Sequence, residues 1–326
     1  MTTRRHFLTT IGLASAASLA PWPSAAQSPA ARTPLYPPTD LSMFDRPIGG
    51  VQPFAMPLAY QAITWGGKDL QAIEEIGAGG FKGIQLRSPI FAEYGSKPAE
   101  LKAILTKHKV SLVVLSSGNV NGDPKVEADE ITRHMKHAQF VKDLGGLYLQ
   151  VIDERPKGRA ATPDDYKRMG ALLTKLGTRC TDMGVTLVYH NHMNALGERP
   201  EEVDAVLAAA DPRFVKLLLD IAHYTQSGGD PVKAVQAYHQ RTAVIHLKDV
   251  ISPLPGDTKE PMRSYRFVEL GRGKVNITGV VQALRQVRFR GWGVIELDAV
   301  PDPARTPKEC LAINKQYVED TLKLKV

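Results

Sequence analysis

The feature that most constrains this chain is a repeated alternation of short apolar segments with segments of helical period. From about residue 54 onward, eight strand-length runs rich in β-branched residues or leucine are separated by stretches whose apolar residues recur at helical spacing. Strands that each lead into a helix require a parallel sheet with helical crossovers, and eight such units favour closure into a barrel. The expected strands span residues 59–64, 83–86, 111–115, 147–152, 185–190, 215–220, 243–247 and 293–297.

We therefore predict an α/β fold, a single-domain (β/α)8 barrel over residues 54–326. An open doubly wound sheet is the alternative, but no GxGxxG turn follows the first strand and the sequence contains no P-loop. The clearest helix lies within residues 162–184, where Thr162 is the expected N-cap, Pro163 fits the first turn and Gly184 supplies the stop.

The N-terminal residues indicate export. Arg4 and Arg5 precede a short apolar stretch, and small residues at 24–26 resemble a cleavage signal, which together describe a twin-arginine signal peptide. We predict a signal peptide over residues 1–26, a proline-rich linker or arm over residues 27–53, and a periplasmic location. The apolar stretch is shorter than the ~20 residues that cross a bilayer, so we expect no membrane association after cleavage.

Charge and cysteine content narrow the function classes. The formal charge is +7, but lysine and arginine are scattered with no run of five, so we expect a solvated basic surface and no nucleic-acid partner. Cys180 and Cys310 lie far apart and show no metal-binding spacing, so we expect two buried thiols. The sequence does not indicate an oligomeric state.

Four of the apolar runs end on a histidine or a carboxylate. Neighbouring strands lie ~4.8 Å apart, and catalytic groups of such barrels stand at the C-terminal ends of the strands, so inward side chains there can converge. Two imidazoles and two carboxylates suit a divalent cation such as Mn²⁺, Co²⁺, Zn²⁺, Fe²⁺ or Mg²⁺. For any single member, a hydrogen-bonded core role is the alternative. The predicted metal-binding residues are His190, Asp220, His246 and Glu296.

Further polar residues lie close to these strand ends in the sequence. His192 shares the side-chain parity of His190 and is either an alternative ligand or a proton-transfer group. His223, one helical turn beyond Asp220, is expected to face the same cavity, and Lys248 to hold a substrate oxygen. The long segment 249–275 is a candidate lid. The predicted substrate-binding residues are His223, Lys248, Glu269, Trp65 and Arg87.

These residues resemble motifs of the xylose isomerase-like barrel superfamily, which includes sugar phosphate isomerases and epimerases, inosose dehydratases, ketose 3-epimerases and apurinic-site endonucleases. The similarity covers roughly residues 55–324. The motifs that carry it are Tyr189-His190-Asn191-His192, Leu218-Leu219-Asp220-Ile221-Ala222-His223, His246-Leu247-Lys248-Asp249, Glu269-Leu270-Gly271-Arg272-Gly273 and Ile295-Glu296.

The resemblance implies a metal held by Glu, Asp, His and Glu from consecutive strand ends. Asp220, His246 and Glu296 match three of these positions, whereas His190 stands where many members carry glutamate. The resemblance also implies that His223 contacts substrate hydroxyls. Because the first glutamate is missing, Glu296 paired with a histidine fits proton transfer better than a two-glutamate mechanism.

We predict a divalent-metal-dependent enzyme that removes a proton α to the carbonyl of a keto-sugar or inosose, with Glu296, His192 and His223 as the catalytic residues. Because phosphorylated sugars are chiefly intracellular, a free sugar, an inosose or an oxidised glycoside suits an exported enzyme better than a sugar phosphate. We therefore favour elimination by a lyase or dehydratase over isomerisation or epimerisation through the same enediolate. The small-molecule partner is a sugar or polyol. A non-catalytic sugar-binding barrel is the alternative of another class, and an endonuclease is disfavoured because it requires more metal ligands.

Overall fold

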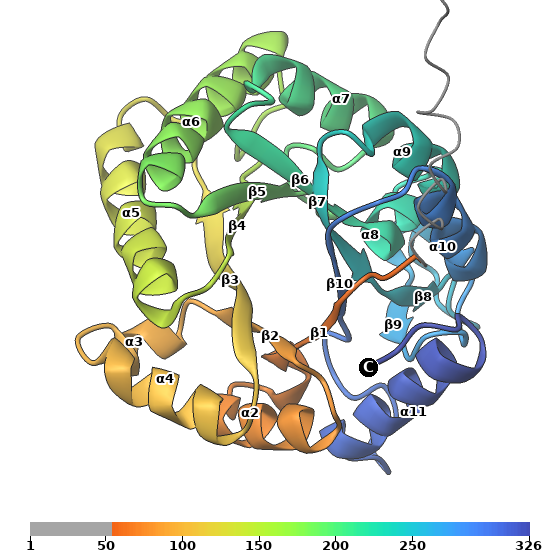
Figure 1. The fold of residues 1–326 in the computed structure, drawn as a ribbon. Helices are drawn as coiled ribbons and strands as arrows, with labels where there is room; N and C mark the ends of the chain where they lie inside the picture. Colours follow the sequence, from red (N-terminus) through yellow and green to blue (C-terminus); the bar gives the residue numbers. More distant parts are fainter. Residues whose placement is uncertain (1–53) are drawn as a thin grey trace, which may run out of the picture. The chain divides into compact units, whose positions relative to one another are not determined.

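The protein forms a closed barrel of parallel strands wrapped by helices (Figure 1). The computed structural model describes residues 54–326, so the predicted signal peptide and the arm over residues 27–53 lie outside the described residues. Hydrogen-bonded neighbours follow the order β1-β10-β7-β6-β5-β4-β3-β2, which confirms the predicted (β/α)8 barrel. The barrel strands are β1 (Leu58–Gln61), β2 (Gly83–Arg87), β3 (Ser111–Val120), β4 (Tyr148–Asp153), β5 (Thr186–His190), β6 (Val215–Asp220), β7 (Thr242–Leu247) and β10 (Trp292–Ile295).

Helices follow the strands and cover the outside of the barrel (Figure 1). The predicted start of α6 is confirmed, because the Thr162 backbone N–H donates to Asp165 Oδ2 at 2.8 Å and closes a capping box. Gly184 follows the helix in the left-handed region with φ +77°. The helices are α2 (Asp69–Ala78), α3 (Ile90–Tyr94), α4 (Pro98–Lys107), α5 (Glu127–Leu144), α6 (Pro163–Asp182), α7 (Pro200–Ala209), α8 (Ile221–Gln226), α9 (Pro231–Tyr238), α10 (Ile277–Gln286) and α11 (Pro307–Asp320), with 3-10 turns η1 (Ala62–Trp65) and η2 (Pro261–Arg263).

Two strands end three or more residues away from their expected C-terminal bounds. The first was expected to reach residue 64 but ends at Gln61, where the chain turns into η1. The third was expected to end at residue 115 but continues to Val120, through a register irregularity between Ser116 and Asn119. Gly118 lies in this irregularity with φ +89°, a backbone conformation that glycine adopts without strain.

The barrel interior is arranged in layers. Because side chains two residues apart in a strand point to the same side, each apolar residue of one layer is followed by a polar residue in the next layer toward the C-terminal ends. The apolar layer contains Ala59, Val114, Val188, Leu218, Val244 and Val294. The residues two positions further along are Gln61, Ser116, His190, Asp220, His246 and Glu296.

The segment between β7 and α10, expected as a long loop, contains an antiparallel ribbon of β8 (Asp249–Ile251) and β9 (Arg266–Val268). Its far end is tied back by the buried carboxylate of Asp249, which accepts backbone N–H bonds from Gly271 at 3.0 Å, Gly273 at 2.8 Å and Val275 at 3.1 Å. The ribbon is therefore fixed beside the C-terminal end of β7.

Two smaller expectations concern cysteines and membranes. Cys180 and Cys310 are buried free thiols, as predicted. Among the described residues, no helix combines the length and apolar character needed to span a bilayer.

Candidate metal centre

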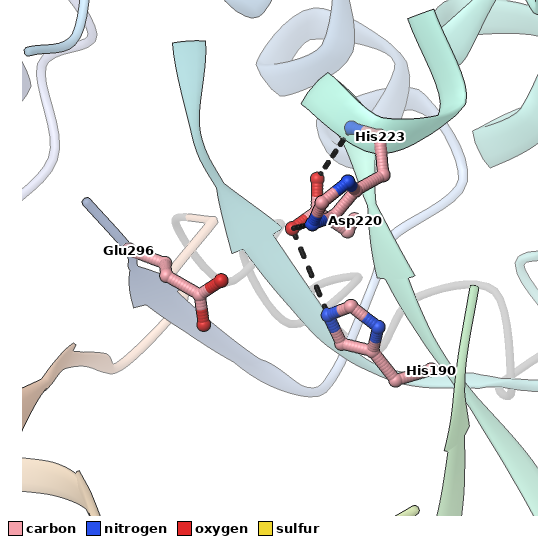
Figure 2. Close-up of side chains that lie close together, drawn as sticks. All are labelled: His190, Asp220, His223 and Glu296. Carbon is pink, nitrogen blue, oxygen red and sulfur yellow. Dashed lines mark hydrogen bonds and ion pairs between the residues drawn. The ribbon is translucent and has the colours of Figure 1, made fainter. Parts of the chain in front are cut away.

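The barrel strands bring the four predicted metal-binding side chains to one place. His190 and Asp220 are the last residues of β5 and β6, His246 lies near the end of β7, and Glu296 directly follows β10. All four are buried, with exposed fractions of 7% or less. Figure 2 shows His190, Asp220 and Glu296, together with His223 of α8, directed toward a common space.

The spacing of the donor atoms fits a single cation. His246 Nδ1 lies 3.1 Å from His190 Nε2, 3.3 Å from Asp220 Oδ2 and 3.2 Å from Glu296 Oε2. The distance between His190 Nε2 and Asp220 Oδ2 is 3.7 Å. Four donors bound tetrahedrally at ~2.1 Å from a metal stand ~3.4 Å apart, so these separations match the donor shell of such an ion.

His223 offers an overlapping set, since one donor atom each of His190, Asp220, His223 and Glu296 lie within 4.8 Å of one another. The contacts distinguish the two histidines. Lys248 Nζ lies 3.2 Å from His223 Nε2, and an ammonium group only donates, so that lone pair is engaged. His246 Nδ1 instead faces the cluster, because its Nε2 lies 2.9 Å from Gln85 Oε1. The geometry therefore favours the set that contains His246.

The two oxygens of the Asp220 carboxylate have different roles, one in capping a helix and one in the cluster. Its Oδ1 caps α8 by accepting backbone N–H bonds from Ala222 at 2.9 Å and His223 at 2.8 Å, which leaves Oδ2 for the cluster. Burial alone raises the pKa of Asp220, but the charge of Lys248 and the contacts with His246 and His190 outweigh burial and hold the pKa below its usual value. Asp220 is therefore an anion that presents one oxygen to the shared space.

Lys248 lies at the edge of the cluster with no exposed surface. Its ammonium group donates to Glu296 Oε1 at 2.8 Å and to Asp298 Oδ1 at 2.6 Å, and it lies 3.9 Å from the ring centroid of Phe267 in β9. Burial lowers the pKa of Lys248, but Asp298, Glu296 and Asp220 together raise it above the ordinary value. The lysine is thus a fixed positive charge beside the predicted metal-binding residues.

The sequence matches the family described as "Xylose isomerase-like TIM barrel" over residues 70–316. The chain belongs to this family. This xylose isomerase-like barrel is 26% identical over 278 residues to the inosose dehydratase of Lacticaseibacillus casei, an alignment that covers 78% of this chain and 90% of the relative. It is 28% identical over 294 residues to the rhizopine catabolism protein MocC of Rhizobium meliloti, covering 80% of this chain and 87% of the relative.

Solved structures share the fold of this xylose isomerase-like barrel. A crystal structure of the IolI protein with a zinc atom superposes with a TM-score of 0.68 at 20% identity, covering 82% of this chain and 98% of the other. The probable 3-DHS dehydratase AsbF from Bacillus anthracis superposes with a TM-score of 0.66 at 15% identity, covering 82% and 100% respectively.

Two other predicted residues of the xylose isomerase-like barrel lie at its C-terminal mouth. His192 is half-buried, its ring centroid lies 3.9 Å from that of His223, and its Nδ1 contacts the Met193 carbonyl oxygen at 2.6 Å. Since that oxygen only accepts, Nδ1 carries the hydrogen and Nε2 the lone pair. Arg87 is the last residue of β2, and its side chain is half-buried. Its Nε has no hydrogen-bond partner among residues 54–326.

Trp65 and Glu269 contact residues outside the cluster. Trp65 is buried, donates from Nε1 to Glu75 of α2 at 2.7 Å and packs edge-on against Tyr60. The buried Glu269 carboxylate pairs with Arg305 and accepts from the thiol of Cys310 in α11. Neither residue has a hydrogen bond or ion pair with the cluster in the described part of the chain, so their predicted contacts with substrate stay predictions.

Sequence reasoning missed several residues of the site, most of them polar. Asp298 shares the parity of Glu296 two residues earlier, which is a readable signal. Gln85 and Gln150 face the barrel interior from β2 and β4, and glutamine alone carries no chemical signal. Phe267 is placed by the ribbon, which the sequence did not indicate.

Proposed function

We propose that the protein is a divalent-metal-dependent enzyme that removes a proton α to the carbonyl of a keto-sugar or inosose and eliminates water, as a dehydratase of the lyase class. The observation that carries this proposal is the convergence of four buried donor atoms, in which His246 Nδ1 lies 3.1–3.3 Å from the other three and His190 Nε2 lies 3.7 Å from Asp220 Oδ2. Relatives named inosose dehydratase, aligned over most of both chains, support the substrate class and the reaction.

His190, Asp220, His246 and Glu296 would hold the ion. A mixed nitrogen and oxygen donor set suits Mn²⁺, Co²⁺, Zn²⁺, Fe²⁺ or Mg²⁺. When bound, the metal supplies a Lewis acid that stabilises negative charge developing on the carbonyl oxygen of the substrate.

We assign proton transfer and substrate orientation to side chains of the protein. Glu296 has one oxygen in the cluster and the other bonded to Lys248, so both of its oxygens are engaged. His192 keeps an Nε2 lone pair at the mouth, and we assign it the removal of the α-proton, with the adjoining His223 orienting substrate hydroxyls. The proton that His192 takes from the α-carbon then passes to the departing hydroxyl, which leaves as water. Lys248 keeps its own protons and stabilises the leaving oxygen as a fixed positive charge.

The proposal is tested by solvent isotope exchange. Purified metal-loaded protein is incubated in D₂O with inososes, keto-sugars and oxidised glycosides, and NMR follows deuterium entry next to the carbonyl and the formation of an unsaturated product. We expect both for at least one substrate. Exchange with return of the same or an epimeric sugar would assign an isomerase or epimerase, and no exchange across the panel would leave a sugar-binding barrel.

We also propose export to the periplasm by the twin-arginine route, based on Arg4, Arg5 and the small residues at 24–26. Fractionation of cells that produce the full chain should recover a shortened protein from the periplasm. Replacing both arginines with lysine should retain the full-length chain in the cytoplasm, and an unchanged distribution would disprove the export signal.

A further inference from the structure

A chain of buried hydrogen bonds crosses the barrel from β4 through β2 to β7. Gln85 Nε2 donates to Gln150 Oε1 at 2.5 Å, and Gln85 Oε1 lies 2.9 Å from His246 Nε2. The exposed fractions of Gln85, Gln150 and His246 are 0%, 3% and 0%, so water does not compete freely for these groups.

The direction of this chain determines which nitrogen of His246 carries hydrogen. A glutamine amide has one accepting oxygen and one donating nitrogen, and neither titrates at ordinary pH. Because the Gln85 nitrogen is engaged by Gln150, its oxygen faces His246 and accepts a hydrogen bond from Nε2–H. The Nδ1 lone pair then points toward Asp220 and Glu296.

The surroundings of Nδ1 alone would favour the opposite arrangement. Carboxylate oxygens lie 3.3 Å and 3.2 Å from Nδ1 and would attract a hydrogen on that nitrogen, which would block a cation. His190 offers a contrast, because its buried Nδ1 has no hydrogen-bond partner among residues 54–326. Of these two cluster histidines, His246 is the one whose far nitrogen is held by a protein group.

We propose that Gln85, oriented by Gln150, is a positioning residue that keeps the hydrogen of His246 on Nε2 and so prepares Nδ1 to bind a divalent cation. The inference rests on the proposed metal site and deepens it. Groups that hold the far nitrogen of a metal-binding histidine typically change metal affinity by ~10–100-fold.

The test compares Gln85→Met with Gln85→Glu. Methionine approximates the length of glutamine but cannot accept the hydrogen bond as well as an amide oxygen, whereas a glutamate oxygen still accepts from Nε2–H. Zn²⁺ affinity of the metal-free proteins is measured by chelator competition. We expect Gln85→Met to weaken binding ~10–100-fold and Gln85→Glu to stay within a few-fold of wild type.

A direct readout comes from ¹⁵N NMR of metal-free protein labelled at histidine, with the His246 signals identified by their loss in His246→Asn. Wild type and Gln85→Glu should carry hydrogen on Nε2, and Gln85→Met should gain a population with hydrogen on Nδ1. Hydrogen on Nδ1 in the wild type, or unchanged Zn²⁺ affinity in Gln85→Met, would overturn the inference.

Two further variants separate this effect from loose packing. Gln226→Met replaces another buried glutamine, whose amide contacts the ribbon segment at Pro261 and Met262, and it should retain wild-type Zn²⁺ affinity. Gln150→Leu frees Gln85 to rotate and should show a smaller loss than Gln85→Met, which also keeps the inference testable if Gln85→Met does not fold. An equal loss in Gln226→Met would contradict it.

The Zn²⁺ affinity and the NMR spectrum can be measured whether or not the protein turns over a substrate. A wild type that binds Zn²⁺ in a Gln85-dependent manner but exchanges no α-proton would disprove the proposed enzyme and retain the inference. A wild type that binds no divalent ion would disprove the proposed metal site, and the NMR spectrum would still decide whether Gln85 sets the His246 tautomer.

Discussion

Residues 54–326 contain two buried histidine clusters, which differ in the groups that face the imidazoles. In the barrel, His190 and its neighbours face Asp220 and Glu296. Between β3 and α5, Ser117 Oγ lies 2.5 Å from His134 Nδ1 and 2.7 Å from His137 Nδ1. A hydroxyl both donates and accepts, so one serine can pair with the Nδ1 atoms of both rings.

The two clusters differ in the carboxylate oxygens that face the imidazoles. The acid beside the outer cluster, Glu130, is bonded to Arg133 at 2.7 Å and to the Asn121 backbone N–H at 3.0 Å. Burial raises its pKa, but the contact with His134 Nε2 at 3.4 Å and the hydrogen bond from Arg133 lower the pKa to about 2. Its charge is thus satisfied within the protein, whereas Asp220 and Glu296 each keep an oxygen in the shared space. Buried histidines alone do not make a metal site, and what the barrel cluster adds is carboxylate oxygens that face the imidazoles.

The largest expected effect that tests this comparison is the loss of metal in Asp220→Asn. An asparagine oxygen can still cap α8, so the barrel should fold with a melting temperature near that of wild type, while the missing charge should abolish stoichiometric metal and α-proton exchange. Elemental analysis, circular dichroism and deuterium exchange measure these properties. Ser117→Ala in the outer cluster is the control and should keep its metal. Metal retained in Asp220→Asn would show that the ion is bound elsewhere.

The next test distinguishes the two histidines that follow β5. His190→Ala should lose metal because it removes a donor 3.1 Å from His246 Nδ1. His192→Ala should keep metal and lose ~10²–10⁴-fold in the exchange rate, the usual contribution of a general base. Metal content and exchange are measured on both variants. The reverse result, with metal lost only in His192→Ala, would exchange the two roles.

The sequence predicted the barrel and the cluster for the same reason, which is the two-residue period of a strand. Val188 and His190, or Leu218 and Asp220, place an apolar layer beneath a polar one, and this alternation is visible without coordinates. The glutamine chain could not be predicted, because contact between Gln85 and His246 depends on how non-neighbouring strands meet across the closed barrel.

The wrong end of the first strand and the missed outer histidine cluster each have a local cause. The chain leaves β1 at Gln61, earlier than expected, and Trp65 follows in a 3-10 turn with its indole N–H bonded to α2. The outer cluster was missed because Ser117 meets the histidines through an irregularity in β3, where the pairing register shifts.

The smallest effect expected is a pH dependence of stability from the outer cluster. Burial lowers the pKa of His137 to about 4, below the ~6.5 of an unfolded histidine. Between these pH values His137 is protonated in the unfolded chain but not in the folded protein. The free energy of unfolding therefore falls as pH decreases from ~6.5 to 4, and this contribution becomes constant below pH 4. His137→Asn, which can still donate to Ser117, should have a shallower dependence in this window.

Urea unfolding of metal-free wild type and His137→Asn at pH 7, 6, 5 and 4 measures this difference directly. Both proteins keep His190 and His223, whose pKa values burial also lowers, so the difference between the two proteins isolates the outer cluster. Metal content of His137→Asn at pH 7 should equal that of wild type. Identical pH slopes would mean that His137 binds its proton as readily in the folded protein as in the unfolded chain, and a loss of metal would erase the distinction between the two clusters.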